Sequence, residues 1–169
     1  MSYTLEQFAA DCRAALLAEP GPAGREQVRR HVERACSDAD FVADNVRPDQ
    51  AQERHLLYED PDLGFCILAH VYRGARHSGP HDHADSWAIY GQAEGVTEMT
   101  DWRVLERPAA GRPGKVAAER VYSLTPGVAY LYNEGDVHSP SRAADTRLIR
   151  IEGVNLLGRK RDRYEVVQA

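Results

Sequence analysis

The chain has 169 residues, of which 43% are hydrophobic and 28% charged, values that fit one globular domain with its own core. The formal net charge of −5 argues against a protein that binds nucleic acid through a basic face. Three cysteines without a C-x-x-C pair argue against a disulfide framework, and no stretch has the features of a secretory signal or a membrane span. We therefore expect a cytoplasmic protein with neither nucleic-acid nor membrane partners.

Residues 1–45 have the periodicity of helices. In "YTLEQFAADCRAALLAE" the apolar residues recur at helical spacing, and Thr4 and Gln7 form a candidate capping box. These apolar residues are Leu5, Phe8, Ala9, Cys12 and Leu16. The run "PGPAG" at 20–24 ends this helix, and the next segment places Val28, Val32 and Ala35 on one face of a second helix.

After Pro48 the pattern changes to short β-type runs separated by turn residues. The runs are "RHLLYE", "FCILAHVYR", "SWAIYGQA", "VTEMTDWRVLE", "KVAAERVYSL", "VAYLY", "VHS" and "DTRLIRIEGVNL". Seven or eight strands with no helices between them predict a mainly β fold, either a small antiparallel barrel or a double-sheet jelly roll. We divide the chain into an N-terminal helical extension, 1–45, packed on a β-barrel, 46–169. The basic run "GRKRDRY" at 158–164 is interpreted as a solvated tail.

The stretch "SGPHDHADSWAIYGQAEG" contains two histidines, His81 and His83, one residue apart. In an extended segment such a pair faces the same way, so both rings can point into a barrel. His138 follows a Gly-Asp turn at the start of a later strand and is the candidate third ligand. Asp85 shares the parity of the two histidines and stays an outside candidate, whereas Glu94 lies in an expected hairpin turn and is interpreted as solvated.

Three neutral imidazoles would leave the full charge of a divalent metal ion uncompensated and several of its coordination positions open. An anionic substrate could then bind the metal directly and supply the missing negative charge. Iron(II) suits imidazole ligands with open positions for O₂, and zinc, nickel and manganese are the alternatives. The sequence therefore predicts a mononuclear metal site that accepts a small anionic molecule.

The two histidine segments resemble the motifs of the cupin superfamily. "GPHDHADSWAIYGQAEG" is similar to the first cupin motif, and "TPGVAYLYNEGDVH" is similar to the second, which supplies a further histidine. The first motif usually carries a glutamate ligand four or five residues after its second histidine, where this chain has Trp87 and Ala88. The resemblance implies a cupin double-stranded β-helix, a jelly-roll barrel, with His81, His83 and His138 as metal ligands. A homodimer is the assembly that the resemblance suggests.

Within the superfamily, "HDHADSWAIYGQAEG" and the helical N-terminal region resemble the cysteine-dioxygenase-like group of thiol dioxygenases. "ERHLLYEDPDLGFCILAHVY" resembles the segment that carries a substrate-binding arginine in this group, which assigns Arg54 to a substrate carboxylate. Tyr72 and Trp87 are further candidates for the substrate pocket. Arg150 is a candidate as well, either entering the pocket with Glu152 as a charged pair or facing solvent with it.

The chain departs from this group in two places. Ala88 stands where animal-type cysteine dioxygenases have the cysteine of a Cys–Tyr crosslink. The group's Ser-x-His-x-Tyr relay corresponds to "RLIRIEG", with Leu148, Arg150 and Glu152 at the three positions. Neither the crosslink nor the usual relay can form, so the substrate can differ from cysteine.

Three functions remain open at this stage. The first is a thiol-dioxygenase-like Fe(II) oxygenase that adds O₂ to a small anionic substrate. The second is an O₂-independent lyase, isomerase or hydrolase in which zinc or nickel acts as a Lewis acid. The third is a cupin that binds a small molecule without turning it over.

Overall fold

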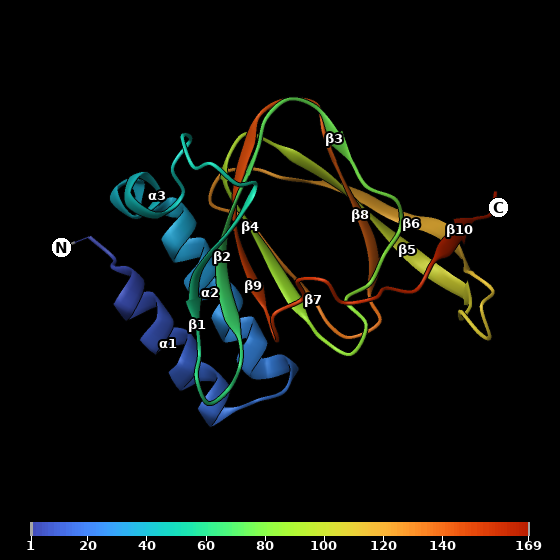
Figure 1. Cartoon of the computed structure of the whole chain (residues 1–169), viewed down its shortest axis with the longest axis horizontal. Helices are drawn as coiled ribbons and strands as arrows, with labels where there is room; N and C mark the ends of the chain where they lie inside the picture. Colours follow the sequence, from blue (N-terminus) through green and yellow to red (C-terminus); the bar gives the residue numbers. More distant parts are fainter. Residues whose placement is uncertain (1, 169) are drawn as a thin grey trace.

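We describe the fold from a computed structural model, which describes residues 2–168 (Figure 1). Three helices come first: α1 (Leu5–Ala18), α2 (Pro22–Ser37) and α3 (Ala39–Asn45). Ten strands follow: β1 (Arg54–Glu59), β2 (Cys66–Tyr72), β3 (Arg76–His77), β4 (Ala88–Glu94), β5 (Thr97–Glu106), β6 (Gly114–Leu124), β7 (Ala129–Tyr132), β8 (Val137–Arg142), β9 (Thr146–Glu152) and β10 (Tyr164–Val166).

The helices begin and end where their local sequence specifies. The capping box of α1 is confirmed, because the Thr4 side chain accepts from the Gln7 backbone N–H and the Gln7 side chain accepts from the Thr4 backbone N–H. Helix α2 begins at Pro22, whose fixed φ suits a first helical position. The expected apolar faces are buried. Among the described residues, no helix has the length and apolar character needed to span a bilayer.

The strands form two five-stranded sheets that face each other across the barrel (Figure 1). The strand order is β1-β2-β9-β4-β7 in the first sheet and β10-β6-β5-β8-β3 in the second. All pairs are antiparallel except β10 with β6. The two sheets form the predicted double-stranded β-helix, a jelly-roll barrel. The eight expected strands are present, and the sequence analysis missed only the short strands β3 and β10.

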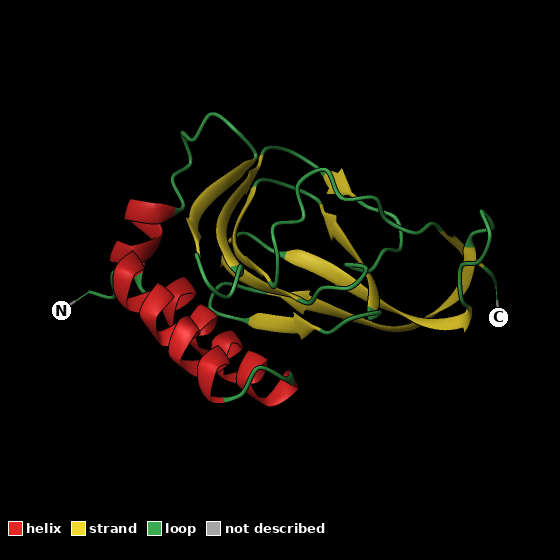
Figure 2. Cartoon of the chain, turned by 60° about the horizontal axis from the view of Figure 1, so that its bottom comes forward, coloured by secondary structure: helices red, strands yellow, loops and turns green. Residues whose placement is uncertain are grey.

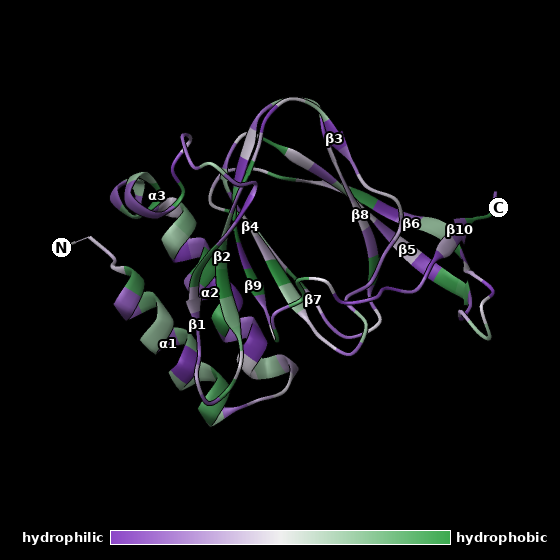
Figure 3. Ribbon diagram, viewed as in Figure 1, coloured by the Kyte–Doolittle hydropathy of each residue, from purple (hydrophilic) through white to green (hydrophobic). Residues whose placement is uncertain are grey.

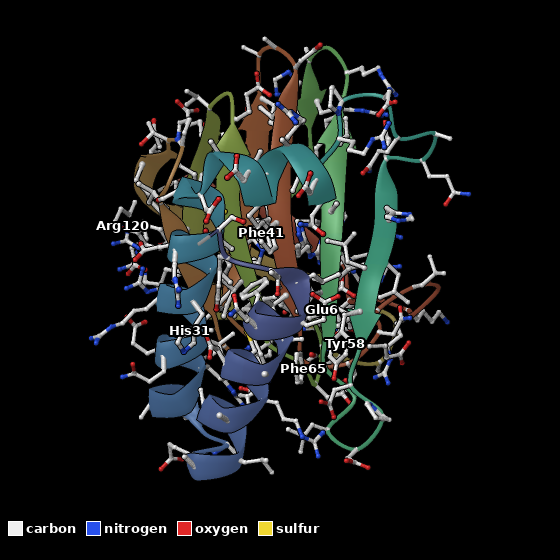
Figure 4. The ribbon with its side chains drawn as sticks, turned by 90° about the vertical axis from the view of Figure 1, so that its left-hand side faces the viewer. Glu6, His31, Phe41, Tyr58, Phe65 and Arg120 are labelled. Atoms are coloured by element: carbon white, nitrogen blue, oxygen red, sulfur yellow. The ribbon has the colours of Figure 1, made fainter. Side chains whose placement is uncertain are left out.

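The central strands of the first sheet, β2, β9 and β4, are buried on both faces because the helices cover the outer side of the sheet (Figure 2). Alternate side chains of β9 point in opposite directions: Ile149 and Ile151 join the core beneath the helices, while Leu148 and Arg150 line a cavity inside the barrel. The hydropathy colours show strongly hydrophobic segments of β2 beside α2 (Figure 3). Seen from outside, α3 with Phe41 lies over the strands (Figure 4). The helical layer therefore holds the wall of the cavity in place.

Helix α2 approaches β4 most closely at Gly91. A Cβ atom at this position would lie 2.3 Å from Val32 Cγ1 and 2.8 Å from Cys36 Sγ. We expect Gly91→Ala to lower the free energy of unfolding by about 1–3 kcal/mol, because a methyl group would overpack this contact. Urea unfolding measures the change, and Gly79→Ala is the control because a Cβ at Gly79 meets nothing within 4 Å. Equal stability of the two variants would contradict the close helix–sheet contact.

A buried carboxylate, Asp60, ties the turn after β1 to helix α1. Its oxygens accept hydrogen bonds from Arg13 Nη1 at 2.7 and 2.8 Å and from the backbone N–H of Leu63 at 2.7 Å. Tyr58 donates a further hydrogen bond at 3.0 Å. Burial alone would raise the pKa of Asp60, but these donors outweigh it and lower the pKa to about 2.

The lowered pKa predicts how Asp60 contributes to stability as the pH changes. Its contribution is complete above the ordinary carboxyl pKa of 3.8 and is lost as the pH falls through about 2. We expect Asp60→Asn to cost about 2 kcal/mol at pH 7, because its donors lose a charged acceptor. The difference from the wild type should shrink toward pH 2. Denaturant unfolding at several pH values checks this, with the exposed Asp62→Asn as control; a pH-independent difference would contradict it.

The C-terminal segment is more structured than the expected solvated tail. Residues 157–163 are exposed, but Arg159 and Arg161 line the cavity of the barrel. Beyond them, β10 pairs with β6, and the Tyr164 hydroxyl donates to Asp82 Oδ2 at 2.6 Å. The segment crosses from β9 to the second sheet at the end of the chain drawn in red (Figure 1). The tail prediction was therefore only partly right.

A candidate metal centre in an arginine-lined cavity

Three histidines from two separate segments meet inside the barrel. His138 lies on β8, and its backbone N–H and C=O pair with those of His81 at 2.9 and 3.0 Å, so this bridge fixes the position of the H-x-H loop. His83 lies two residues further along the loop, ahead of β4, and is 1% exposed. The predicted histidine cluster is thus present.

The free nitrogens of these rings converge on one point. One ligand atom from each of the three histidines can be chosen so that all lie within 4.8 Å of one another, and His83 Nε2 is 3.2 Å from His138 Nε2. In the part of the chain that the structure describes, no carboxylate joins this group. Asp85 instead pairs with Arg159 at 3.1 Å, and Glu94 pairs with Arg147 on the surface. The candidate ligand set is therefore three imidazoles without an acidic residue.

Hydrogen bonds at the opposite ring edges select the tautomers of two histidines. His81 Nδ1 lies 2.9 Å from the carbonyl oxygen of Gly79, and His138 Nδ1 lies 3.1 Å from that of Asp136. Because a carbonyl can only accept, each Nδ1 carries the hydrogen and each Nε2 keeps its lone pair. Metal-bound histidines are oriented in this way in proteins. The donor set therefore fits a divalent transition metal.

All three imidazoles are neutral at pH 7. Burial lowers the pKa of His81 to about 4 and holds the pKa of His83 and of His138 far below the usual value of 6.5. The nearby Arg150 guanidinium lowers these values further. A neutral imidazole is the form that ligates a metal, so no deprotonation is needed at physiological pH.

Tyr132 stacks on the His138 ring with the ring centres 3.9 Å apart, and two further side chains approach the ring nitrogens of the cluster. The Tyr90 hydroxyl lies 3.3 Å from His83 Nε2 and 3.4 Å from His138 Nε2. Arg150 places Nη2 3.4 Å from His83 Nδ1 and its guanidinium carbon 4.8 Å from the centre of the Tyr90 ring. His83 thus has a cation, rather than a carbonyl, beside its second nitrogen. Tyr90 is the one hydroxyl recorded in contact with these nitrogens within residues 2–168.

His81 and Tyr90 line a cavity of about 490 Å³ with a strongly cationic wall, whereas His83 and His138 lie buried behind it. Six arginines and two glutamates line it, in a protein whose net charge is negative. The charged residues are Glu53, Arg54, Arg76, Arg142, Arg150, Glu152, Arg159 and Arg161. Such a wall attracts small anions and disfavours cations.

Three of the four candidate substrate residues line this cavity: Arg54, Tyr72 and Arg150. Arg54 is already engaged, because its Nη2 donates to Glu152 Oε2 and to Asn155 Oδ1, both at 2.9 Å. Arg150 Nε also lies 3.2 Å from Glu152 Oε1. The alternative in which Arg150 and Glu152 face solvent is therefore wrong: both side chains are buried and point into the barrel.

The fourth candidate, Trp87, lies elsewhere. Its side chain packs in the core beneath the helices, against Gly153 and under the Arg25 guanidinium, and it does not line the cavity. The reason is the alternation of an extended chain: Trp87 and Ile89 face the helices, whereas Ala88 and Tyr90 face the interior. The same alternation could have identified Tyr90, had the direction of the strand been known.

Comparisons with known proteins add little to this picture. No protein-family model matches the chain, and no curated protein matches its sequence. Among solved structures, a cupin-2 domain containing protein from Shewanella frigidimarina is similar over 61% of this chain and 81% of its own, with 16% identity and a TM-score of 0.43. KdgF from a Halomonas species is similar over 59% of this chain and 74% of its own, with 15% identity and a TM-score of 0.44. A conserved protein with a double-stranded β-helix domain from Klebsiella pneumoniae is similar over 72% of this chain and 94% of its own, with 13% identity and a TM-score of 0.45.

Proposed function

We propose that this protein is a thiol-dioxygenase-like oxygenase, in which His81, His83 and His138 hold one iron(II) ion. The substrate is a small anion that carries a thiol or a carboxylate, and the reaction adds O₂ to it. One observation supports this most: three neutral imidazoles converge with no carboxylate beside them, and one of them, His81, lines a cavity whose wall is cationic. When bound, iron(II) would supply adjacent positions for O₂ and for the donor atom of the substrate.

The residues of the chain perform the remaining tasks. The arginines of the cavity draw an anionic substrate inward and orient it. The walls of the barrel keep most water away from the histidines, of which His83 and His138 are fully enclosed. Tyr90 holds a proton at its hydroxyl oxygen, which lies 3.3 Å from His83 Nε2 and 3.4 Å from His138 Nε2.

The proposal also accounts for the departures from the cysteine-dioxygenase-like pattern. Leu148, Arg150 and Glu152 line the cavity at the positions of the missing relay. Arg150 lies beside both His83 and Tyr90, so a cation replaces the hydroxyl–imidazole pair in this place. We therefore infer that the substrate carries more negative charge, or a different skeleton, than cysteine does.

Oxygen uptake tests the proposed function. Protein loaded anaerobically with iron(II) is mixed with O₂ and a panel of small thiols, with and without carboxylates. We expect uptake that requires both the metal and a thiol. Equal turnover of a substrate without O₂ would favour a lyase, isomerase or hydrolase. Binding without any turnover would favour a non-catalytic binding protein.

Tyr90→Phe probes the hydroxyl that lies beside His83 Nε2 and His138 Nε2. We expect metal content to stay unchanged, because the imidazoles are untouched, and kcat to fall about 100-fold because a positioned proton donor is lost. Oxygen-uptake kinetics and metal analysis check this together. Tyr130→Phe is the control, since Tyr130 lies on the neighbouring strand and packs against Tyr122. If Tyr90→Phe lost its metal as well as its hydroxyl, Tyr90 would instead be a metal ligand.

A further inference from the structure

We propose that Tyr122 is a one-electron donor that protects the metal centre, and that its electron reaches the histidine cluster through Tyr132. Oxidising equivalents that arise at the histidines without a substrate to consume them would otherwise attack the histidines themselves. The inference rests on the proposed function in one respect: an iron ion is taken to bind at the cluster. It concerns neither the substrate nor the cavity that would hold it.

The tyrosines form a continuous aromatic path. Tyr132 stacks on the His138 ring, with the ring centres 3.9 Å apart and the planes inclined by 23°. Its hydroxyl oxygen lies 2.6 Å from that of Tyr122, which stands on the facing sheet. The ring centre of Tyr90 is 5.3 Å from that of Tyr132, and the ring centre of Tyr130 is 4.4 Å from that of Tyr122. Four of the eight tyrosines thus belong to one group that touches the histidine cluster.

The hydrogen bonds along this path all have the same direction. Asp101 accepts from Arg120 Nε at 3.1 Å and from Arg120 Nη2 at 2.6 Å, as an ionised carboxylate that can only accept. The Tyr122 hydroxyl therefore donates to Asp101 Oδ1, at 2.8 Å. Because this uses the one hydrogen of that hydroxyl, Tyr132 donates to the Tyr122 oxygen. Each proton thus has an acceptor on the side away from the histidines.

This direction matters because a phenol releases its proton when it loses an electron. Burial raises the pKa of Tyr122, so its hydroxyl is protonated at pH 7. Asp101 is in place as the base, and its side chain is 22% exposed, so it can pass the proton on to water. Tyr130 stacks on Tyr122, but its hydroxyl has no protein acceptor within residues 2–168. Of these two neighbours, only Tyr122 has a base for its proton.

The oxidant in this step is hydrogen peroxide. Its reduction to two water molecules takes up two electrons and two protons. One electron comes from iron(II), which becomes iron(III), the other comes from Tyr122, and both protons come from solvent. The hydroxyl proton of Tyr122 passes to Asp101 Oδ1, which leaves a neutral tyrosyl radical. A soluble thiol then returns a hydrogen atom to Tyr122 and is left as a thiyl radical, while Asp101 releases its proton to solvent.

The outer end of the path opens into a second cleft, of about 440 Å³. Asp101, Arg120, Tyr130 and Tyr132 are among the residues that line it. This cleft shares no lining residue with the arginine-lined cavity beside His81. A reductant from solution can therefore reach the tyrosines without entering the cavity proposed for the substrate. Such a separation suits a protective path, which must work whether or not substrate is bound.

Electron paramagnetic resonance of freeze-quenched samples tests this inference. Iron(II)-loaded protein without substrate is mixed anaerobically with hydrogen peroxide, and a parallel sample carries ring-deuterated tyrosine, which narrows any tyrosyl signal. We expect a tyrosyl radical in the wild type. In Tyr122→Phe and in Asp101→Asn its yield should fall about tenfold or more, because a positioned base contributes about 100-fold or more to a proton transfer. Tyr130→Phe is the matched control and should keep the wild-type yield.

Peptide mass spectrometry of the same samples gives a second readout. Oxidation of the three histidines should rise in Tyr122→Phe by about the factor by which the radical yield falls, and it should stay at the wild-type level in Tyr130→Phe. A wild-type radical yield in Tyr122→Phe, or unaltered histidine oxidation, would overturn the proposal. If Tyr122→Phe failed to fold, Asp101→Asn, which leaves every ring in place, would decide alone.

Neither readout uses a substrate, so the results separate this inference from the proposed function. Thiol-dependent oxygen uptake without a tyrosyl radical would overturn the inference and leave the oxygenase proposal standing. A radical that depends on Tyr122, without oxygen uptake on any thiol, would do the reverse. Protein that binds no iron would contradict both proposals, and metal analysis of the same samples identifies that case.

Discussion

His138→Ala is expected to lose bound metal and oxygen uptake together. His138 is one of only three imidazoles in the cluster, and its ring nitrogen lies 3.2 Å from that of His83. Two remaining histidines would hold a divalent metal far more weakly, so we expect metal content to fall at least tenfold after dialysis and uptake to fall at least 1000-fold. Metal analysis and uptake on the same samples measure both.

His77→Ala is the matched control for this variant. His77 lines the same cavity but is exposed and contacts Ser141, so its removal leaves the cluster intact. We expect wild-type metal content in this control. Tight metal retention and unchanged turnover in His138→Ala would remove His138 from the ligand set and leave the proposed function without its basis.

Glu152→Ala is expected to destabilise the fold by about 3 kcal/mol. The Glu152 carboxylate is buried between Arg54 and Arg150 and also accepts from the Leu156 backbone N–H at 2.9 Å. Removing it leaves two arginines without their anion and frees the start of the C-terminal segment. Breaking a buried ion pair by removing one partner is costly for this reason. Denaturant unfolding of metal-free protein measures the loss.

Glu94→Ala provides the comparison, since Glu94 pairs with Arg147 on the surface. We expect a change below about 1 kcal/mol there, as for other exposed ion pairs. If Glu152→Ala were no more harmful than Glu94→Ala, the cavity network would contribute little to stability.

The strand pattern and the histidine cluster were predictable from the sequence because both depend on local features. Alternation, turn residues and the H-x-H spacing specify strands and place His81 and His83 on one face. The third histidine, His138, was predicted because it follows a second turn. In the structure, the β-bridge between His81 and His138 places it beside the other two histidines. No sequence signal, however, showed which face of β4 was internal, and Trp87 was therefore placed in the cavity while Tyr90 was not.

The charged part of the site was harder to predict because it depends on contacts between distant residues. Arg54 meets Glu152 across 98 positions of sequence, and Tyr164 meets Asp82 across 82. Arg142 has no motif around it, and only the folded arrangement places its guanidinium over the Tyr72 ring inside the barrel. The short strand β10 has three residues, too few to produce a recognisable pattern.

The link between Tyr164 and Asp82 has a consequence for biosynthesis. Asp82 stands between the two histidines of the loop, and its buried carboxylate accepts a hydrogen bond from Tyr164 on β10, the last strand along the chain. On the ribosome, the loop is therefore made long before the residue that anchors it. We expect the metal centre to be completed only after Tyr164 has emerged and can reach the loop.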